Sequence, residues 1–502
     1  MKSGPRHFSL LLAPFHWPCL KTTLENAKRL AAIKSAFEIG FAGYEEHAWG
    51  CDELLPVDNS SSNTFGGWGA TAVDALGTAI IMDLPEIVDK ILDYIPTIKF
   101  DAPRPGTVSL FETTIRYLGG ILSAYDLMKE KASAATSADL RKMDALLTQA
   151  VQLANNMTFA FNTTTGIPQG RISLHSQSHD GSHFNTIAGC GTLVLEWTRL
   201  SDITGDPTYT RLTQKAEEYL LNPQPASSEP FPGLIGTRLQ ISNGQFLDAS
   251  GGWGGSGDSY YEYLIKMYAY DNKRFSKYKH RWILAADSTM ANLTSHPAGR
   301  SDLTFVANFH DTRLELFSSN LACFHGGNFI FGGVVLQEQK YVRYGLDLVA
   351  SCRHTYSKTA TGIGPDGFRW DSNVPLDQQD FYDRNGFYID GSSYLLRPEV
   401  LESYYYAYRA TGDQKYREWC WEAISAILHT TRVGSGYSQI HDVNIEGGGG
   451  FKNMQESFFF AEVLKYAYLI FAPDAVYQVA NGKRQHYVFN TEAHPLKVAL
   501  EL

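Results

Sequence analysis

The run at residues 397–402 combines two carboxylates and a guanidinium near the start of one predicted helix. Glu399 and Glu402 are three residues apart, so both side chains lie on the same face of that helix. Pro398 suits the first turn, where its missing N–H is not needed. Arg397 precedes all three. The pattern is typical of a polar site and not of core packing.

Two further acidic residues stand beside aromatic residues. Glu112 and Arg116 are four residues apart, so they form either a surface ion pair on a helix or part of a functional site. Asp258 follows a glycine-rich segment, where it could cap the next helix or serve as a functional carboxylate. Spacing alone leaves these alternatives open.

The remaining candidates lie towards the end of the chain. Glu462 shares a helix face with Phe458, and a carboxylate on an apolar stripe is costly to bury without a partner or a metal. Thr491 and Glu492 lie in a polar turn. They could cap a neighbouring element, or they could supply the hard oxygen ligands that calcium prefers.

The segments that carry these residues are predicted to be mostly helical. Apolar residues recur at helical spacing in the ranges 21–49, 109–127, 140–159, 192–200, 209–221, 259–270, 277–293, 400–411, 414–430 and 454–471. Two similar turns, 204–209 (TGDPTY) and 411–416 (TGDQKY), each join two helical patterns, with a glycine to end one helix and an aspartate to cap the next. Repeated helical hairpins cannot bury their faces alone, so we expect them to stack into a solenoid or close into a ring.

Seven blocks of the sequence resemble glycoside hydrolase family 47, the class I α-mannosidases. They occur in the family's order and span nearly the whole chain, which makes the resemblance specific. The blocks are 44–54 (YEEHAWGCDEL), 68–76 (WGATAVDAL), 111–125 (FETTIRYLGGILSAY), 258–264 (DSYYEYL), 396–403 (LRPEVLES), 456–462 (ESFFFAE) and 489–496 (FNTEAHPL).

The resemblance implies an all-α fold, an (α/α)7 barrel of helical hairpins in which residues 21–502 form a single catalytic barrel. It implies an inverting, calcium-dependent exo-α-1,2-mannosidase that trims mannose from high-mannose N-glycans. Thr491 matches the threonine whose carbonyl and hydroxyl oxygens bind Ca²⁺, a hard ion that prefers oxygen. The carboxylates that match those holding the waters around the ion are Glu399, Glu402, Glu462 and Glu492.

The resemblance also assigns the catalytic groups. Inversion needs an acid on one face of the sugar and a base that activates water on the other, with the two carboxyls roughly 6.5–9.5 Å apart. Glu112 matches the family's proposed general acid and Glu399 its proposed base. Asp258 matches a third essential carboxylate, an alternative acid.

Further matches concern the substrate and the compartment. Arg116 and Arg397 match arginines near the acid and the base, and Phe458 matches an aromatic residue that packs on the terminal sugar. Cys323 and Cys352 match the family's disulfide, which favours an oxidising compartment.

Four positions bear on the type of family member. Asn320, His325 and Gly77 stand where the family usually has His, Asp, and Asp or Ser. These departures raise the alternative of a non-catalytic glycan-binding protein on the same fold, although the retained carboxylates favour the enzyme. Ser256 stands where endoplasmic-reticulum members carry Arg. A small residue there resembles the Golgi and secreted fungal type, for which we expect trimming of several branches.

Composition bounds the remaining possibilities. The chain has 502 residues, 44% of them hydrophobic, and a net charge of −10, which disfavours a nucleic-acid binder. No apolar run reaches the roughly 20 residues of a membrane helix, so we expect no stable membrane insertion. The Asp-rich metal motifs of a terpenoid cyclase, another helical toroid, do not occur in the sequence. We expect a monomer whose partner is a high-mannose N-glycan.

The beginning of the chain and its sequons bear on the compartment. Residues 1–20 form either a short signal peptide interrupted by prolines or an amino-terminal arm. Sequons begin at Asn59, Asn156, Asn162 and Asn292, which gives modest support for secretion. No Cys-x-x-Cys pair occurs, which argues against a zinc site. We therefore expect a protein of the secretory pathway, in the Golgi or secreted.

Overall fold

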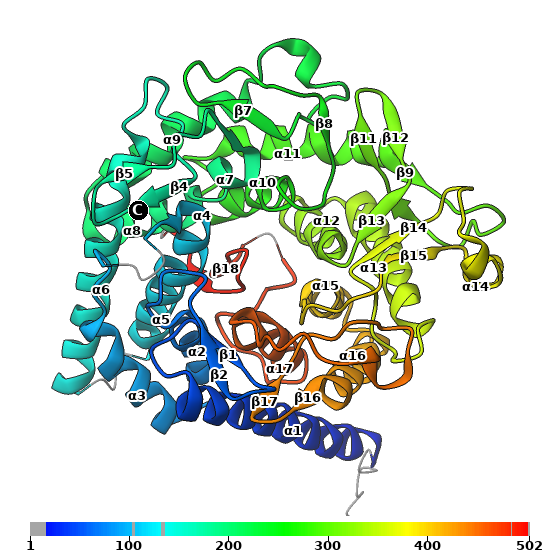
Figure 1. Ribbon diagram of the computed structural model, residues 1–502, viewed down its shortest axis with the longest axis horizontal. Helices are drawn as coiled ribbons and strands as arrows, with labels where there is room; N and C mark the ends of the chain where they lie inside the picture. Colours follow the sequence, from blue (N-terminus) through cyan, green and yellow to red (C-terminus); the bar gives the residue numbers. More distant parts are fainter. Residues whose placement is uncertain (1–16, 103–105, 132–135, 483, 500–502) are drawn as a thin grey trace, which may run out of the picture.

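The computed structural model describes residues 17–102, 106–131, 136–482 and 484–499, with side chains from residue 24 onward. The expected signal peptide or arm therefore lies largely outside the described residues. Helices dominate the molecule (Figure 1). The helices are α1 (Trp17–His47), α2 (Ala70–Ile81), α3 (Pro85–Tyr94), α4 (Leu110–Glu112), α5 (Gly119–Glu130), α6 (Ser137–Met157), α7 (Ile187–Gly191), α8 (Val194–Thr204), α9 (Thr208–Leu221), α10 (Asp258–Tyr270), α11 (Ser276–Ser288), α12 (Phe324–Leu336), α13 (Gln339–Ser357), α14 (Gln379–Asn385), α15 (Glu399–Thr411), α16 (Lys415–Thr431) and α17 (Leu464–Leu469).

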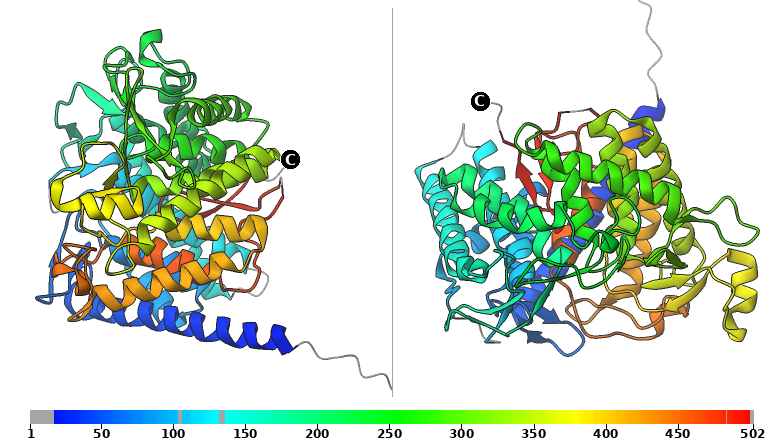
Figure 2. Two further views of the ribbon diagram at one scale, coloured as in Figure 1. Left: turned by 90° about the vertical axis from the view of Figure 1, so that its right-hand side faces the viewer. Right: turned by 90° about the horizontal axis from the view of Figure 1, so that it is seen from above.

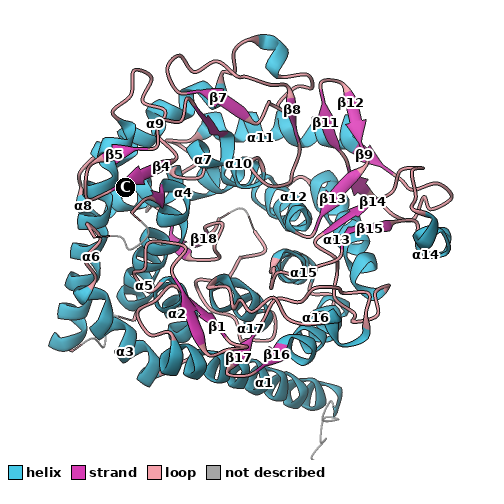
Figure 3. Cartoon of the chain, viewed as in Figure 1, coloured by secondary structure: helices cyan, strands magenta, loops and turns pink. Residues whose placement is uncertain are grey.

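Short antiparallel strands add small sheets to this helical frame, so the expectation of an all-α fold is correct only in outline. Figure 3 shows the strands in the connections between helices, where long links pair with one another. The strands are β1 (Glu53–Leu55), β2 (Ser60–Ser62), β3 (Val108–Ser109), β4 (Arg171–Ser173), β5 (Ser178–His179), β6 (Phe184–Thr186), β7 (Arg238–Gln240), β8 (Ser250–Gly251), β9 (Thr294–Ser295), β10 (Phe305–Val306), β11 (Asn308–His310), β12 (Arg313–Glu315), β13 (Phe317–Ser319), β14 (Gly367–Arg369), β15 (Tyr388–Gly391), β16 (Arg432–Val433), β17 (Gly436–Tyr437), β18 (Tyr487–Phe489) and β19 (Pro495–Lys497).

The helices form two concentric layers. Consecutive helices pack in pairs, which are α2 with α3, α5 with α6, α8 with α9, α10 with α11, α12 with α13, and α15 with α16. The first helix of each pair also packs against the first helix of the next pair, and α1 packs against α17. Figure 1 shows the inner helices surrounding a central space. In the side view of Figure 2, α1 runs along the outside of the molecule. The structure thus favours the ring over an open solenoid.

The two similar turns do what their sequences predict. Gly205 ends α8 with φ 74° and Gly412 ends α15 with φ 70°, both in the left-handed region that favours glycine. Asp206 and Asp413 each accept the backbone N–H two residues later, at 2.9 and 3.0 Å. Each turn therefore reverses the chain from an inner helix to its outer partner.

A hairpin of β18 and β19 projects into the centre of the ring (Figure 1). Its strands are antiparallel, with Val488 opposite Leu496, and every residue of β18 is buried. The hairpin packs on α5 and α10, two of the inner helices. Residues 490–494 form its turn, so they are carried to the middle of the molecule. No helix in the described part of the chain has both the length and the apolar character to cross a bilayer.

Candidate active site

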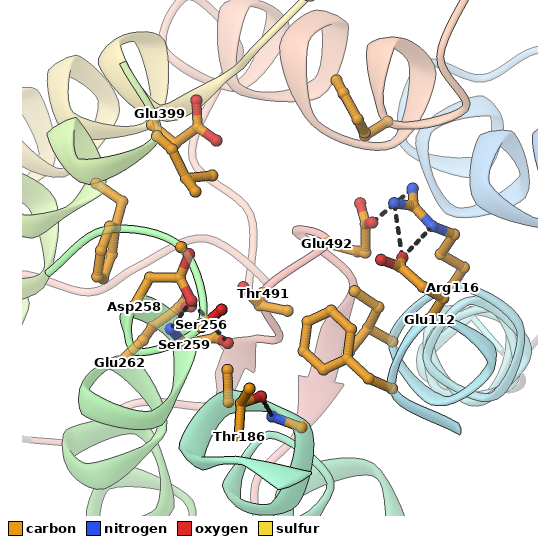
Figure 4. Close-up of a pocket in the computed structure, with 18 of the residues that line it drawn as sticks. Glu112, Arg116, Thr186, Ser256, Asp258, Ser259, Glu262, Glu399, Thr491 and Glu492 are labelled. Carbon is orange, nitrogen blue, oxygen red and sulfur yellow. Dashed lines mark hydrogen bonds and ion pairs between the residues drawn. The ribbon is translucent and has the colours of Figure 1, made fainter. Parts of the chain in front are cut away.

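A cavity of about 420 Å³ lies within the ring and is lined by segments from all parts of the chain. Every residue predicted to act on a substrate or a metal lines it. These residues are Glu112, Arg116, Asp258, Arg397, Glu399, Glu402, Phe458, Glu462, Thr491 and Glu492. Figure 4 shows how several of them face one another. The structure therefore brings the whole predicted set together.

The start of α15 presents two carboxylates to the cavity. Glu399 and Glu402 are 7% and 6% exposed. Burial raises the pKa of Glu399 to about 7, against the opposing effect of the nearby Arg397 cation, which is itself held by Asp366 at 2.7 Å. Tyr466 donates to Glu402 at 3.3 Å, whereas Oε2 of Glu399 has no hydrogen-bond partner among the described residues. Such a buried, unpaired oxygen is suited to binding a ligand hydroxyl, a water or a cation.

Arg116 gathers carboxylates on another wall of the cavity. Its Nε lies 2.9 Å from Oε2 of Glu112, and its NH1 lies 2.6 Å from Oε1 of Glu492. Asp74 lies 3.6 Å from NH1, and the ring of Phe65 covers the guanidinium at 4.2 Å. Burial alone lowers the pKa of Arg116, but the surrounding carboxylates outweigh it and raise the pKa above its usual value. Because Arg116 is only 5% exposed, the Glu112–Arg116 pair is not a surface ion pair.

The first two turns of α10 supply two more carboxylates. Asp258 is the first residue of the helix and accepts the backbone N–H of Ser259 at 2.8 Å, and burial raises its pKa to about 7. It therefore stands at a helix start and also lines the cavity. Glu262 lines the cavity one turn later and forms an ion pair with the buried Lys266. Glu262 was not predicted as a site residue, although its spacing of four residues from both Asp258 and Lys266 was a signal for it.

A short π-helical segment, Phe459–Val463, carries Glu462 to the cavity. Burial raises the pKa of Glu462 well above its usual range, and the neighbouring Glu492 carboxyl raises it further. Phe458 directly precedes this segment, and its ring centroid lies 5.6 Å from the guanidinium of Arg116. An apolar ring among carboxylates offers a surface for the apolar face of a polar ligand.

The turn of the central hairpin places Thr491 between the walls of the cavity (Figure 4). Its N–H donates to the hydroxyl of Tyr263 at 3.2 Å, while neither its carbonyl nor its hydroxyl oxygen accepts a hydrogen bond from the described residues. Oε2 of Glu492 is likewise buried and unpaired within the described chain. These hard oxygen donors fit Ca²⁺, which takes about 6–8 oxygen ligands and often includes waters among them.

The donor set also limits how an ion could be held. The described residues contain no group of three or more His, Cys, Asp or Glu side chains placed to hold a metal ion. Thr491 offers oxygen atoms of the kind that such an ion prefers, and the surrounding carboxylates line the same cavity.

Glu399 and Glu112 lie on opposite sides of the cavity, with Thr491 between them (Figure 4). Asp258 and Glu262 lie together along a further part of the wall. Two carboxyls that face each other across an enclosed space can donate a proton on one side of a bound molecule and accept one on the other. The arrangement is suited to acid–base chemistry at a single bond.

Three residues that depart from the family pattern, Asn320, His325 and Gly77, do not line the cavity. Asn320 is buried and donates to the hydroxyl of Tyr356 at 3.1 Å. His325 is buried, and burial lowers its pKa to about 3, so it is neutral at ordinary pH. Neither of these residues, nor Gly77, lines the cavity, whereas Ser256 does. The departures therefore leave the cavity-lining carboxylates in place.

The predicted disulfide is present between Cys323 and Cys352. Cys323 directly precedes α12 and Cys352 lies in α13, so the bond joins an inner helix to its outer partner. Cys190 and Cys420 are buried within the fold.

The sequence was compared with models of known protein families. The model of glycosyl hydrolase family 47 matches residues 36–498. The chain belongs to glycosyl hydrolase family 47. Its membership confirms the resemblance carried by the seven sequence blocks and makes the protein a glycoside hydrolase.

Relatives in family 47 match along nearly their whole length. A mannosyl-oligosaccharide alpha-1,2-mannosidase of Coccidioides posadasii is 56% identical over 480 residues, which cover 95% of this chain and 92% of the relative. A probable mannosyl-oligosaccharide alpha-1,2-mannosidase 1B of Aspergillus niger is 53% identical over 484 residues, covering 96% and 94%. The solved structure of an alpha-1,2-mannosidase from Trichoderma reesei matches with a TM-score of 0.92 at 49% identity, covering 94% of this chain and 99% of that one.

Proposed function

We propose that this family 47 protein is an exo-acting mannosyl-oligosaccharide α-1,2-mannosidase that trims mannose from high-mannose N-glycans. Relatives that share 56% and 53% of its residues carry the name of that activity. The observation that carries the proposal is the pair Glu112 and Glu399, which face each other across the cavity (Figure 4). The central hairpin fills the ring behind Thr491, which suits attack at the end of a glycan branch. Because the small residue Ser256 lines the cavity, we expect several branches to be accepted.

The proposed reaction inverts the anomeric centre in one displacement. Glu399 accepts a proton from the attacking water, and Glu112, oriented by Arg116, donates a proton to the leaving oxygen. Room for that water requires carboxyls roughly 6.5–9.5 Å apart. Asp258 is the alternative acid, and its pKa of about 7 keeps a proton available near neutral pH.

The calcium site belongs to the same proposal. Thr491 offers its carbonyl and hydroxyl oxygens, and burial raises the pKa of the adjacent Glu492 to about 8 against the opposing effect of the Arg116 cation. Bound Ca²⁺ would orient vicinal hydroxyls of the terminal mannose. Glu402 and Glu462 accept hydrogen bonds from waters or sugar hydroxyls around that position.

Three further side chains position the substrate. Phe458 packs its ring against the terminal sugar. Arg116 holds Glu112 and Glu492. Arg397 is paired with Asp366, and both arginines donate to sugar oxygens. Arginine suits this role because its planar fork keeps its direction and its charge at all working pH values.

The proposal also covers the architecture of the barrel, the oligomeric state and the cellular compartment. We infer a single (α/α)7 catalytic barrel over residues 21–502, closed by the packing of α1 on α17. We propose that it acts as a monomer in the secretory pathway, in the Golgi or secreted. The disulfide between Cys323 and Cys352 supports an oxidising compartment.

The proposal is tested by determining which anomer of mannose is released and from which branch of the glycan. A high-mannose glycan with all its branches is digested while NMR follows the released sugar, and β-mannose is expected first. Glu399→Gln should lower kcat by at least about 10³-fold, since it removes a positioned base. Glu418→Gln, at an exposed ion pair with Arg29, should match the wild type. Release of α-mannose, or near-normal turnover by Glu399→Gln, contradicts the mechanism.

A chelator provides the second arm of the test. Removal of calcium should abolish mannose release and lower Tm, and added calcium should restore both, because a ligand that binds only the folded state stabilises it. Glycan binding without release, at any calcium concentration, would favour the non-catalytic alternative.

A further inference from the structure

The turn that carries Thr491 is held from behind by two buried side chains. Nζ of Lys465, on α17, donates to the carbonyl oxygen of Ala493 at 2.6 Å. The hydroxyl of Tyr263, on α10, accepts the N–H of Thr491 at 3.2 Å. Lys465 is 0% exposed and Tyr263 is 1% exposed. Two inner helices thus each send one polar side chain to the same turn.

The turn is also organised from within. Oδ1 of Asn490 accepts the N–H groups of Glu492 and His494 at 2.9 and 2.8 Å. Ala493 has φ 54°, a left-handed conformation that residues other than glycine adopt uncommonly and at a cost in free energy. The carbonyl of this strained residue is the one that Lys465 binds. The lysine therefore holds the turn at its one residue with a left-handed backbone conformation.

A stabilising role does not explain the choice of lysine. Taking an amine out of water is costly, and an apolar side chain of similar volume would fill the same space without that cost. Burial lowers the pKa of Lys465 to about 7, which reflects the same penalty. Lysine adds two things over methionine at this place. One is a donor aimed at the Ala493 carbonyl, and the other is a positive charge near the carboxyls of Glu462, Asp74 and Glu492.

The hydroxyl group of Tyr263 is also held in one orientation by its hydrogen bonds. Its hydroxyl donates to Oε1 of Glu196 at 2.6 Å, which leaves its oxygen oriented to accept from Thr491. Glu196 also accepts from Nδ2 of Asn490 at 2.8 Å. Neither Lys465 nor Tyr263 lines the cavity, so neither is placed to touch a ligand there.

We propose that Lys465 and Tyr263 are positioning residues that fix the direction of the Thr491 oxygens and thereby set the affinity of this turn for Ca²⁺. The inference rests on the proposed calcium site at Thr491. It adds two residues that contact neither the ion nor the sugar but determine how well the turn is preorganised for binding.

The test measures calcium binding directly. Calcium alone is titrated by calorimetry into chelator-stripped wild type, Lys465→Met and Tyr263→Phe. Lys465→Met should raise the Kd for calcium at least 10-fold and Tyr263→Phe several-fold, and both should gain less Tm than the wild type when calcium is added. Lys465→Arg, which keeps a donor, should bind calcium more tightly than Lys465→Met.

Leu469→Ala is the matched control. Leu469 lies on the same helix and is 1% exposed, so its truncation should lower Tm through a cavity and leave the Kd for calcium unchanged. A Kd within twofold of the wild type for both Lys465→Met and Tyr263→Phe overturns the inference. If Lys465→Met fails to fold, Tyr263→Phe decides it. A wild type that binds no calcium overturns the proposed calcium site as well, which separates the two failures.

Discussion

Arg116 and Glu492 meet inside the cavity with NH1 and Oε1 2.6 Å apart, although they come from distant parts of the chain. The contact joins the segment Thr113–Leu118, directly before α5, to the turn of the central hairpin. Because Arg116 also binds Glu112, one guanidinium sets the relative positions of the proposed acid and of the turn that carries Thr491.

Arg116→Lys should therefore impair catalysis more than charge conservation suggests. Lysine keeps the cation, but it lacks the planar fork that serves Glu112 and Glu492 together. We expect kcat/KM to fall about 100-fold, the usual result of a displacement near 1 Å at a catalytic group. Arg369 is a matched control, since it also contacts several carboxylates but lies on the surface. Arg369→Lys should keep its activity. Equal effects of the two variants in steady-state kinetics would refute this role.

Asp52 should be a major determinant of local stability. Its carboxylate is fully buried and accepts the hydroxyl of Tyr117 at 2.6 Å. It also accepts backbone N–H groups from Phe65, Gly67, Trp68, Gly69 and Ala70. Asp52→Asn turns an amide donor towards those donors, which should lower the free energy of unfolding by roughly 2–4 kcal/mol.

Urea denaturation checks the Asp52 prediction. Asp58→Asn, in the same segment but exposed, should leave the midpoint unchanged. Because the Asp52 loop carries Phe65 over Arg116, Asp52→Asn should also raise KM. An unchanged denaturation midpoint for Asp52→Asn would show that the N–H groups find other acceptors.

Glu217 should make the folded state less stable as pH rises. Burial raises its pKa to about 8 from the ordinary 4.5, and its Oε2 has no partner among the described residues. Between these two pH values the folded state keeps a proton that the unfolded state releases, so stability falls as pH rises from about 4.5 through about 8. Glu217→Gln removes this pH-dependent contribution to the free energy of unfolding. The variant should be more stable than the wild type at pH 8.5 and similar to it near pH 4.5.

The Glu217 prediction is checked by urea denaturation across that pH range. Glu218→Gln, at an exposed neighbouring carboxylate paired with Lys277, should keep the slope of the wild type. If Glu217→Gln keeps that slope as well, the pH dependence arises from other groups.

The disulfide should stabilise the folded protein mainly by restricting the conformations of the unfolded chain. Cys323 and Cys352 are 29 residues apart in sequence, and closing a loop of that size is worth roughly 3–4 kcal/mol in the chain-entropy description. The double variant Cys323→Ser/Cys352→Ser should lose about that much stability. A reducing agent should lower the Tm of the wild type and leave the Tm of the double variant unchanged. An equal effect on both would mean that reduction acts elsewhere.

The helices of the fold could be predicted only in part from the periodicity of apolar residues. Periodicity predicted helices such as α6 and α9, which have one buried face and one exposed face. It did not predict α2, all of whose residues are buried, or α12, which is buried almost throughout. A helix enclosed on every side has a weaker apolar stripe, so the 3.6-residue signal is weaker there. The inner helices α8 and α10 are also mostly buried, and the periodicity nevertheless predicted them. α13 does have such a stripe, through Tyr341, Leu348 and Cys352, and could have been predicted.

The candidate site was predicted more completely than the fold because its residues lie in short recognisable blocks. What those blocks could not predict is the contact between them. The ion pair of Asp74 with Arg116 and the hydrogen bond of Lys465 to Ala493 each depend on how distant or separately predicted segments pack together. Such pairings arise from tertiary packing and leave no local periodicity in the sequence.

The packing of α1 against α17 has a consequence for how the protein is made. The side chains buried in this contact include Ile33, Phe37 and Phe41. They leave the ribosome early and cannot be buried against α17 until that helix has been synthesised. At bacterial or eukaryotic translation rates that delay is on the order of a minute. Throughout that time the nascent chain displays a long amphipathic helix without its partner, which makes α1 the segment on which chaperones would be expected to act first.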